Sequence, residues 1–282
     1  PETKDTSAAA IWSLSTDNAP NKDTIAKLGG IDPLVGLLVS GTTEKSQMCV
    51  AGALTALASK HLDNRQLVVK RLVGLLGSSA AKKIEIAGRV LVTISHFMGD
   101  SSANQVMVAK AGGIPPLLTW VQHASQAAKT HACAAMLALV ADNATAQTLV
   151  ARSAGIPPLI DAIRTSRSTP AAQEYAARAL WHLASQPENQ QLITDNNGIK
   201  PLVAMLSADG DTAPELAAVI MVRLTRANPD VSIIIAEKGG VIPLVKLMSG
   251  GSPGAQQQAA AALAELAIVC RNRDPISNAG GI

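Results

Sequence analysis

The chain has 282 residues, of which 48% are hydrophobic and only 2% aromatic, and its formal net charge is +3. So few aromatic rings argue against a base-stacking surface, and the weak charge gives no electrostatic footprint for nucleic acid. The length is too great for one simple core but is ordinary for an array of repeats.

The elements predicted in chain order are helices, and a short motif of glycine and proline separates many of them. Residues 1–15 indicate the tail of a long helix. The central glycine of the motif then recurs about every 42 residues, with a first interval twice as long, which predicts stacked units of that period. The copies are LGGIDPLV (Leu28–Val35), AGGIPPLL (Ala111–Leu118), SAGIPPLI (Ser153–Ile160), NNGIKPLV (Asn196–Val203), KGGVIPLV (Lys238–Val245) and the final Gly280–Ile282.

One period, residues 144–185, indicates three helices. We expect Gly155 to end the first helix in a left-handed conformation and Pro157 to begin the second. Pro170 is expected to begin a long third helix, and Pro214 and Pro253 to begin its equivalents.

The junction at Asn64–Leu76 departs from this pattern because it lacks the glycine–proline motif. NRQLVVKRLVGLL aligns with NQQLITDNNGIKPLVAML only if five residues are missing from it. We therefore expect one nearly continuous helix there, and a local defect in the array near residues 63–76.

The long third helix carries a recurring Ala-Leu signature, and an Asn-Gln pair precedes some of the glycine–proline motifs. The signature occurs as AGALTALAS (Ala51–Ser59), CAAMLALVA (Cys133–Ala141), AARALWHLAS (Ala176–Ser185) and AAALAELAI (Ala260–Ile268). Over essentially its whole length the chain resembles the armadillo repeat family. The resemblance implies an all-α, right-handed superhelical solenoid of three-helix armadillo repeats, whose third helices line a concave groove.

We expect residues 1–282 to form a single armadillo-repeat array with about six complete repeats. Partial repeats are expected at 1–15 and 273–282, and the absence of polar caps predicts a segment of a longer protein. The complete repeats are expected at 17–60, 61–100, 102–142, 144–186, 187–228 and 229–272.

The sequence contains no phosphate-binding loop, no GxSxG or HExxH motif and no calcium loop, so we expect no enzymatic activity and no cofactor. The cysteines, Cys49, Cys133 and Cys270, have neither disulfide nor zinc-site spacing, and no metal is expected. We expect all three to be small buried hydrophobic residues in a reducing compartment.

In nuclear-import adaptors of the armadillo family, the groove presents Asn at one position of the third helix and Trp four residues earlier. Here no repeat keeps either residue, which argues against recognition of a nuclear localisation signal in the family's manner. The helical phase predicts instead an uneven groove of mixed charge. The predicted groove residues are Arg89, Thr93, Glu174, Arg178, Trp181, His182, Glu215, Arg223 and Glu265. As an alternative, Glu174–Arg178 is only a solvated pair, and Trp181 and His182 pack against a neighbouring repeat.

The leading hypothesis is a non-catalytic protein–protein interaction scaffold that binds an extended or helical segment of a partner protein along this groove. The alternative is a structural or self-assembling solenoid, with end-to-end self-association through its uncapped ends. A nucleic-acid partner is not expected because acidic residues interrupt the basic ones. Neither a signal peptide nor a run of about 18 apolar residues occurs, so we expect no membrane association and an intracellular location, cytoplasmic and/or nuclear.

Overall fold

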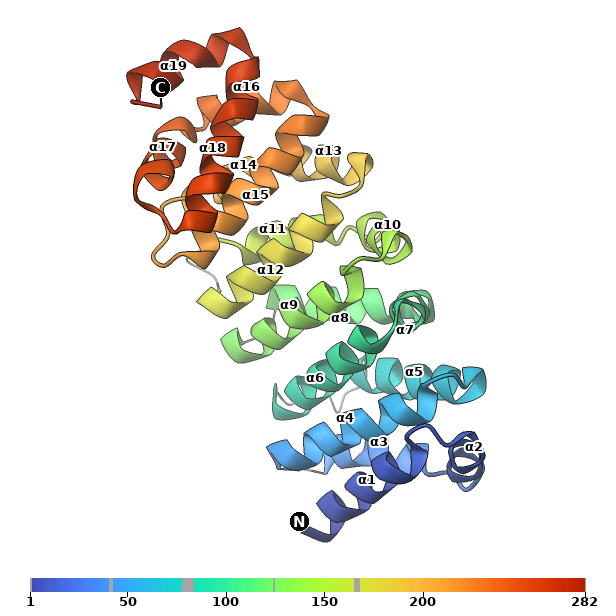
Figure 1. The fold of residues 1–282 in the computed structure, drawn as a ribbon. Helices are drawn as coiled ribbons and strands as arrows, with labels where there is room; N and C mark the ends of the chain where they lie inside the picture. The colour runs from blue at the N-terminus through green and yellow to red at the C-terminus, as the bar shows by residue number, and fades with distance from the viewer. Residues whose placement is uncertain (1, 41–42, 78–83, 124, 165–167, 282) are drawn as a thin grey trace. The chain divides into compact units, whose positions relative to one another are not determined.

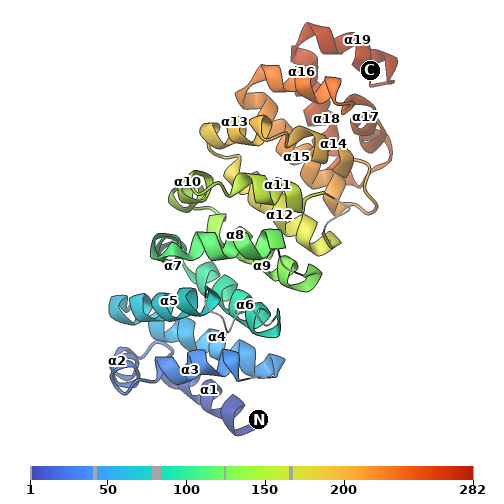
Figure 2. The same cartoon turned by 180° about the vertical axis from the view of Figure 1, so that it is seen from behind.

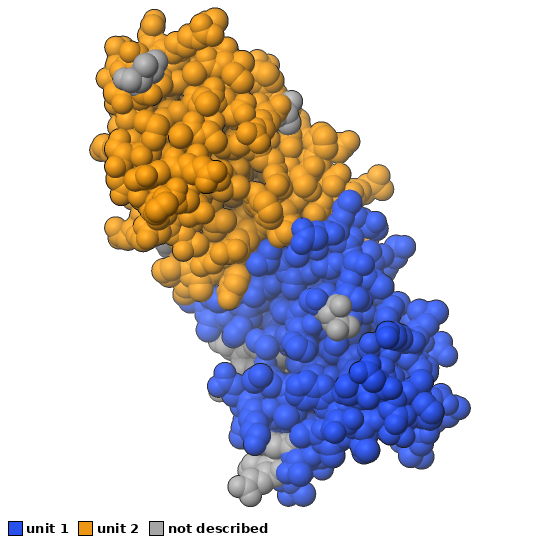
Figure 3. Space-filling view, viewed as in Figure 1, with its two compact units in different colours: residues 1–146 blue, residues 147–282 orange. Residues whose placement is uncertain are grey.

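A computed structural model describes residues 2–40, 43–77, 84–123, 125–164 and 168–281, and all of its regular elements are helical. The chain divides into two compact units, residues 1–146 and 147–282, which Figure 3 colours separately. The division falls within helix α10 (Ala144–Arg152). The assignment of residues 1–282 to a single domain therefore stays a prediction.

Unit 1 contains a layer of long helices that pack on one another in chain order. α1 packs on α4, α4 on α6, and α6 on α9. Other helices, shorter except for α5, cover this layer: Figure 1 shows α4 in front of α3, and the view from behind in Figure 2 reverses their order. The elements are α1 (Glu2–Ser15), α2 (Ala19–Lys27), α3 (Ile31–Val39), α4 (Glu44–Ala58), α5 (Leu62–Leu76), α6 (Ile84–Asp100), α7 (Ser102–Val108), the π turn η2 (Ala109–Gly113), α8 (Ile114–His123) and α9 (Gln126–Val140).

Unit 2 repeats the arrangement, with α12 packed on α15 and α15 packed on α18. These are the third helices of successive repeats, and buried alanines let them approach closely; Ala176, Ala218 and Ala259 have no exposed surface. The elements that follow α10 are α11 (Ile156–Ala162), α12 (Pro170–Leu183), α13 (Pro187–Asp195), α14 (Ile199–Met205), α15 (Thr212–Ala227), α16 (Pro229–Glu237), α17 (Val241–Gly250), α18 (Pro253–Ile268), the 3-10 turn η4 (Cys270–Asn272) and α19 (Arg273–Asn278).

The corner between the first and second helices differs from the prediction by one residue. Gly155 has an ordinary φ of −77°, and the preceding Ala154 is the left-handed residue, with a φ of 55°. The Gly155 N–H donates to the Val150 carbonyl at 2.9 Å, the bond that closes a Schellman motif. A Cβ on Gly155 would lie 2.9 Å from that oxygen, so close approach, rather than a positive φ, requires glycine here.

The prolines begin two of the three long helices as predicted. Pro170 and Pro253 occupy the first helical positions, behind caps in which the Thr169 and Ser252 hydroxyls accept backbone N–H groups. α15 begins at Thr212, so the prediction that Pro214 begins it was wrong by two residues. A proline is tolerated there because N–H groups in the first turn have no partner within the helix.

The junction without the glycine–proline motif is one continuous helix, as predicted: α5 runs from Leu62 to Leu76 without a corner. In the expected repeat 61–100, α5 therefore replaces the first two helices, and α6 is the long helix. An ion pair between Arg71 Nε and Asp32 Oδ1, at 2.6 Å, links α5 to α3 of the preceding repeat.

In the segment that follows each of four third helices, a buried asparagine bonds back to the end of that helix. In each case the side-chain amide donates to a carbonyl near the helix end, where intrahelical donors run out. The Leu183 and Leu266 carbonyls also accept backbone N–H groups, from Gln186 and Val269. This contact gives a physical reason for the asparagine that precedes the glycine–proline motif. The bonds are Asn64 to Leu57 at 3.1 Å, Asn104 to Phe97 at 2.8 Å, Asn189 to Leu183 at 3.0 Å and Asn272 to Leu266 at 3.1 Å.

Replacing Asn189 with alanine is expected to lower the free energy of unfolding by about 1–1.5 kcal/mol, because the Leu183 carbonyl loses its buried amide donor and keeps only the Gln186 N–H at 3.2 Å. Asn196 is the matched control, since its amide also bonds to a helix-end carbonyl, Leu192 O at 2.7 Å, but is exposed. Asn196→Ala should cost no more than about 0.5 kcal/mol in urea denaturation. Equal costs for the two variants would contradict a structural role for the buried amide.

The cysteines follow the expectation in two cases of three. Cys49 in α4 and Cys133 in α9 are buried, whereas Cys270 is exposed in η4, so the expectation for Cys270 was wrong. The Ala-rich helix α18 ends at Ile268, which places Cys270 just beyond it. Burial raises the pKa of the Cys133 thiol to about 12, and this thiol therefore stays protonated at neutral pH.

Candidate functional site

The third helices of unit 2 and one residue of α13 line an open, shallow cavity of about 440 Å³. Its walls combine apolar, amide and guanidinium groups from three successive repeats. The lining residues are Trp181 on α12, Gln190 on α13, Val219, Val222, Arg223 and Arg226 on α15, and Gln258 on α18. We call this the α15 cavity.

The centre of the α15 cavity is a stacked pair of Trp181 and Arg223. The guanidinium carbon of Arg223 lies 4.2 Å from the ring centroid of Trp181, within range of a cation–π interaction. One guanidinium nitrogen of Arg223 also donates to the Trp181 carbonyl at 2.7 Å. Partial burial lowers the pKa of Arg223, because desolvation disfavours its charged form. The two contacts hold the ring and the cation in one fixed arrangement.

His182 meets the same indole from the side. Its ring centroid lies 4.7 Å from that of Trp181, with an interplanar angle of 72°, an edge-to-face contact. Both residues are half-buried. The structure thus brings together three predicted groove residues, Trp181, His182 and Arg223, and leaves part of the indole accessible in the cavity.

Two ion pairs flank this cluster. On α12, Arg178 Nε donates to Glu174 Oε1 at 2.9 Å. Between α15 and α18, Arg226 Nε donates to Glu265 Oε1 at 2.7 Å, and the glutamate side chain is only 19% exposed. Exposed pairs of this kind contribute about 0–1 kcal/mol each, so they orient the guanidinium groups more than they stabilise the fold.

Glu215 is placed against the beginning of α18 rather than in the α15 cavity. A Cβ on Gly254, the second residue of α18, would lie 2.8 Å from both carboxylate oxygens of Glu215. A carboxylate beside a helix N-terminus is favoured by the helix dipole. Glu215 therefore has a structural contact that accounts for it, although it shares the predicted helical phase.

Gln190 supplies an unsatisfied acceptor at the cavity wall. Its Nε2 donates to the Ala184 carbonyl at 2.7 Å. Its Oε1 is buried and has no hydrogen-bond partner within the described residues. An acceptor in this state costs free energy until an N–H or O–H group reaches it.

Comparison with solved structures gives strong matches to helical-repeat proteins. An engineered protein aligns with a TM-score of 0.75 and 24% identity, over 97% of this chain and 67% of its own. A computationally designed armadillo repeat protein for modular peptide recognition aligns with a TM-score of 0.68 and 19% identity, over 83% of this chain and 98% of its own. A designed armadillo repeat protein in complex with the peptide (KR)4 gives a TM-score of 0.68 and 20% identity, over the same shares.

Comparison of the sequence with protein-family models supports the same fold for part of the chain. Residues 228–268 match the model of the armadillo/beta-catenin-like repeat. The chain has the armadillo-repeat fold. No curated protein matches the chain in sequence, so the comparisons establish the fold and leave the partner open.

Two of the predicted groove residues, Arg89 and Thr93, lie in unit 1 and not beside the α15 cavity. Thr93 on α6 has no exposed surface, so it cannot contact a partner in this structure. α6 packs against both α4 and α9, which accounts for the burial. Arg89 lies within α6, but its side chain falls outside the described residues.

Unit 1 has its own, smaller cavity on the third-helix face, of about 240 Å³, lined by Trp12, Gly52 and His96 among others. The Trp12 indole lies directly over Gly52 of α4, where a Cβ would come within 2.6 Å of two ring carbons. Gly52 occupies the position at which the nuclear-import adaptors hold Trp. In this repeat, therefore, an indole from α1, the preceding third helix, covers that position.

Sequence reasoning missed Gln190, Val222, Arg226 and Gln258 as members of the α15 cavity. Arg226 follows Arg223 by three residues and shares its face, a signal that helical phase alone could have supplied. Gln190 comes from a first helix, and its approach to the third-helix face was not predictable from the third-helix pattern.

Among the described residues, no group of three or more His, Cys, Asp or Glu side chains is placed to hold a metal ion. No helix in the described ranges is long and apolar enough to cross a membrane.

Proposed function

We propose that this armadillo-repeat chain is a non-catalytic scaffold that binds an extended segment of a partner protein along α12, α15 and α18. The observation that carries the proposal is the α15 cavity, where Trp181 and Arg223 are held in a fixed stack beside apolar and amide groups from three repeats. Tryptophan and arginine are the residues most often responsible for binding energy at protein interfaces.

The cavity suits the repeating chemistry of a peptide. Val219 is half-buried and offers apolar contact to a side chain, and the half-buried Gln258 supplies an amide for the peptide backbone. Three helices in succession provide a surface long enough for an extended chain to be read residue by residue. The fixed stack of Trp181 and Arg223 lowers the entropy lost on binding.

The charges favour a segment that carries carboxylates over a polybasic one. Arg178 and Arg226 are paired with Glu174 and Glu265, and Glu215 lies against α18, so Arg223 is the cavity cation without a carboxylate partner among the described residues. The designed relative in complex with (KR)4 binds a fully basic peptide. We expect (KR)4 to bind this chain weakly, because like charges would meet at the cavity.

A peptide library displayed on phage, selected on the wild-type chain and counter-selected on Arg223→Gln/Arg226→Gln, tests the proposal. We expect selected sequences to contain Asp or Glu and to bind the wild-type chain at least tenfold more tightly than the double variant. Arg152→Gln/Arg271→Gln is the matched control, since it removes equal charge from exposed positions outside the cavity.

Peptides that bind both double variants equally would place recognition elsewhere. Failure to select any peptide, together with association of the chain at rising concentration, would favour the structural alternative. Sedimentation velocity of the wild-type chain measures that association directly.

A further inference from the structure

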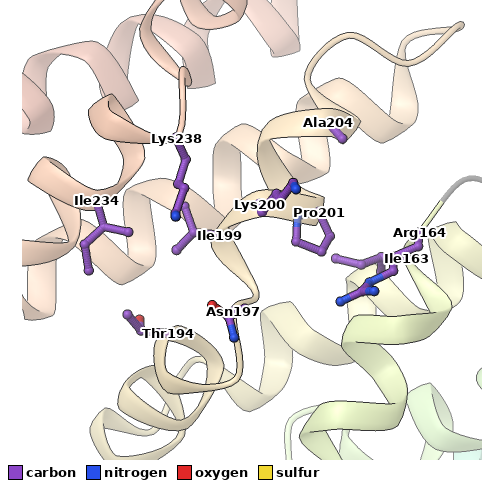
Figure 4. Close-up of a pocket in the computed structure, with 10 residues that line it drawn as sticks. All are labelled: Ile163, Arg164, Thr194, Asn197, Ile199, Lys200, Pro201, Ala204, Ile234 and Lys238. Atoms are coloured by element: carbon purple, nitrogen blue, oxygen red, sulfur yellow. The ribbon is translucent and has the colours of Figure 1, made fainter.

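Unit 2 contains a second, larger cavity that the third-helix face does not use. Its volume is about 610 Å³, and its walls come from α13, α14 and α16 and from residues 163–164 at the end of α11. These are first and second helices of successive repeats. Figure 4 shows the lining side chains, and none of them belongs to α12, α15 or α18.

The floor of this cavity is aliphatic and its rim is cationic. Ile163 and Ile199 are buried and Ile234 is half-buried, one from each of three repeat segments. Arg164, Lys200 and Lys238 surround them, and no acidic residue is among the described residues that line the cavity. In Figure 4 the Lys238 side chain extends toward Ile199, and the Arg164 guanidinium lies beside Pro201.

The rim cations are poorly neutralised by the chain itself. Arg164 Nε lies 3.8 Å from Asp161 Oδ1, a long and half-exposed pair. Lys200 and Lys238 are exposed and form no ion pair within the described part of the chain. The three cations create a field that favours an anionic group, and the aliphatic floor favours an apolar one.

We propose that this cavity is a docking site for a short acidic peptide segment that inserts an aliphatic side chain among Ile163, Ile199 and Ile234. Carboxylates on either side of the aliphatic residue pair with Arg164, Lys200 and Lys238. A free phosphate would use the cations but not the floor, and the cations come from three separate segments rather than converging on one point. The site is independent of the α15 cavity.

The test uses a fluorescein-labelled, terminally blocked peptide of alternating Asp and Leu, with binding followed by fluorescence anisotropy. We expect Lys200→Gln/Lys238→Gln to weaken binding about tenfold, because two rim charges are lost. Lys110→Gln/Lys246→Gln removes the same charge from exposed lysines outside the cavity and should bind as the wild-type chain does. Ala204→Trp, at an exposed lining position, should block the cavity without changing its charge.

The companion probe, alternating Asp and Gly, should bind at least fivefold more weakly, because glycine has no side chain to bury against the aliphatic floor. Equal binding of both peptides, or of both lysine variants, would overturn the proposal. No binding of the Asp–Leu peptide up to about 1 mM would do the same. Binding to vesicles of phosphatidylserine, but not to the peptide, would assign the surface to a membrane instead. Trp181→Leu should leave Asp–Leu binding by this cavity unchanged, which separates it from the α15 cavity.

Discussion

Replacing Phe97 with alanine is expected to lower the free energy of unfolding by about 3–5 kcal/mol, measured by urea denaturation followed by circular dichroism. Phe97 lies on α6 and has no exposed surface. Its removal leaves a cavity among helices that pack on α6 from both sides, α4 and α9, and the surrounding backbone cannot collapse into it freely. Its carbonyl also receives the Asn104 amide, which a shifted α6 would lose.

Two further variants make this expectation specific. Phe97→Leu should retain most of the stability, because Leu57, Leu183 and Leu266 occupy the equivalent position, each accepting a buried asparagine amide. Leu62→Ala, at a position that is 58% exposed on α5, should cost less than about 1 kcal/mol. A cost below about 1 kcal/mol for Phe97→Ala would show that α6 is not part of the cooperative core.

The second large effect is expected in binding. For any peptide selected on the α15 cavity, Trp181→Leu should weaken affinity at least ~30-fold, the range of a hot-spot residue. Leucine keeps apolar volume but loses the ring on which Arg223 stacks and against which His182 rests. Isothermal titration calorimetry with the selected peptide measures the change directly.

Trp120→Leu is the control for this experiment. Trp120 is also half-buried, but it lies on α8 of unit 1, a second helix rather than a third. The Trp120→Leu variant should bind the selected peptide with the affinity of the wild-type chain. Arg223→Lys should give an intermediate loss, because lysine keeps the charge but not the planar stack. If Trp181→Leu binds normally while its helical content is unchanged, the α15 cavity is not the site.

The fold followed from the sequence because its signals are local and repeated. The glycine–proline corner and the Ala-Leu phase recur in register, and the missing corner at Asn64–Leu76 was sufficient to predict that α5 is one helix. The role of Gly155 was misassigned, because the choice between a positive φ and a close backbone contact depends on one residue of register.

The candidate sites were less accessible to sequence reasoning because they combine residues from different repeats. Helical phase placed His182 and Arg223 on one face with Trp181 at its edge, but it could not distinguish them from Thr93, which has the phase of His182 and Arg223 and is buried. The cationic cavity draws Arg164, Lys200 and Lys238 from three segments, each of which resembles an ordinary solvated surface when taken alone.

The buried asparagines have a consequence for how the array opens. Asn64, Asn104 and Asn189 each donate to a carbonyl on the repeat before them, so a repeat that unfolds alone removes a buried hydrogen bond from its neighbour. Nearest-neighbour coupling of this kind makes stability a property of adjacent pairs rather than of single repeats. In native-state hydrogen exchange, the amides at the end of a third helix should therefore lose protection together with the first helix of the repeat that follows.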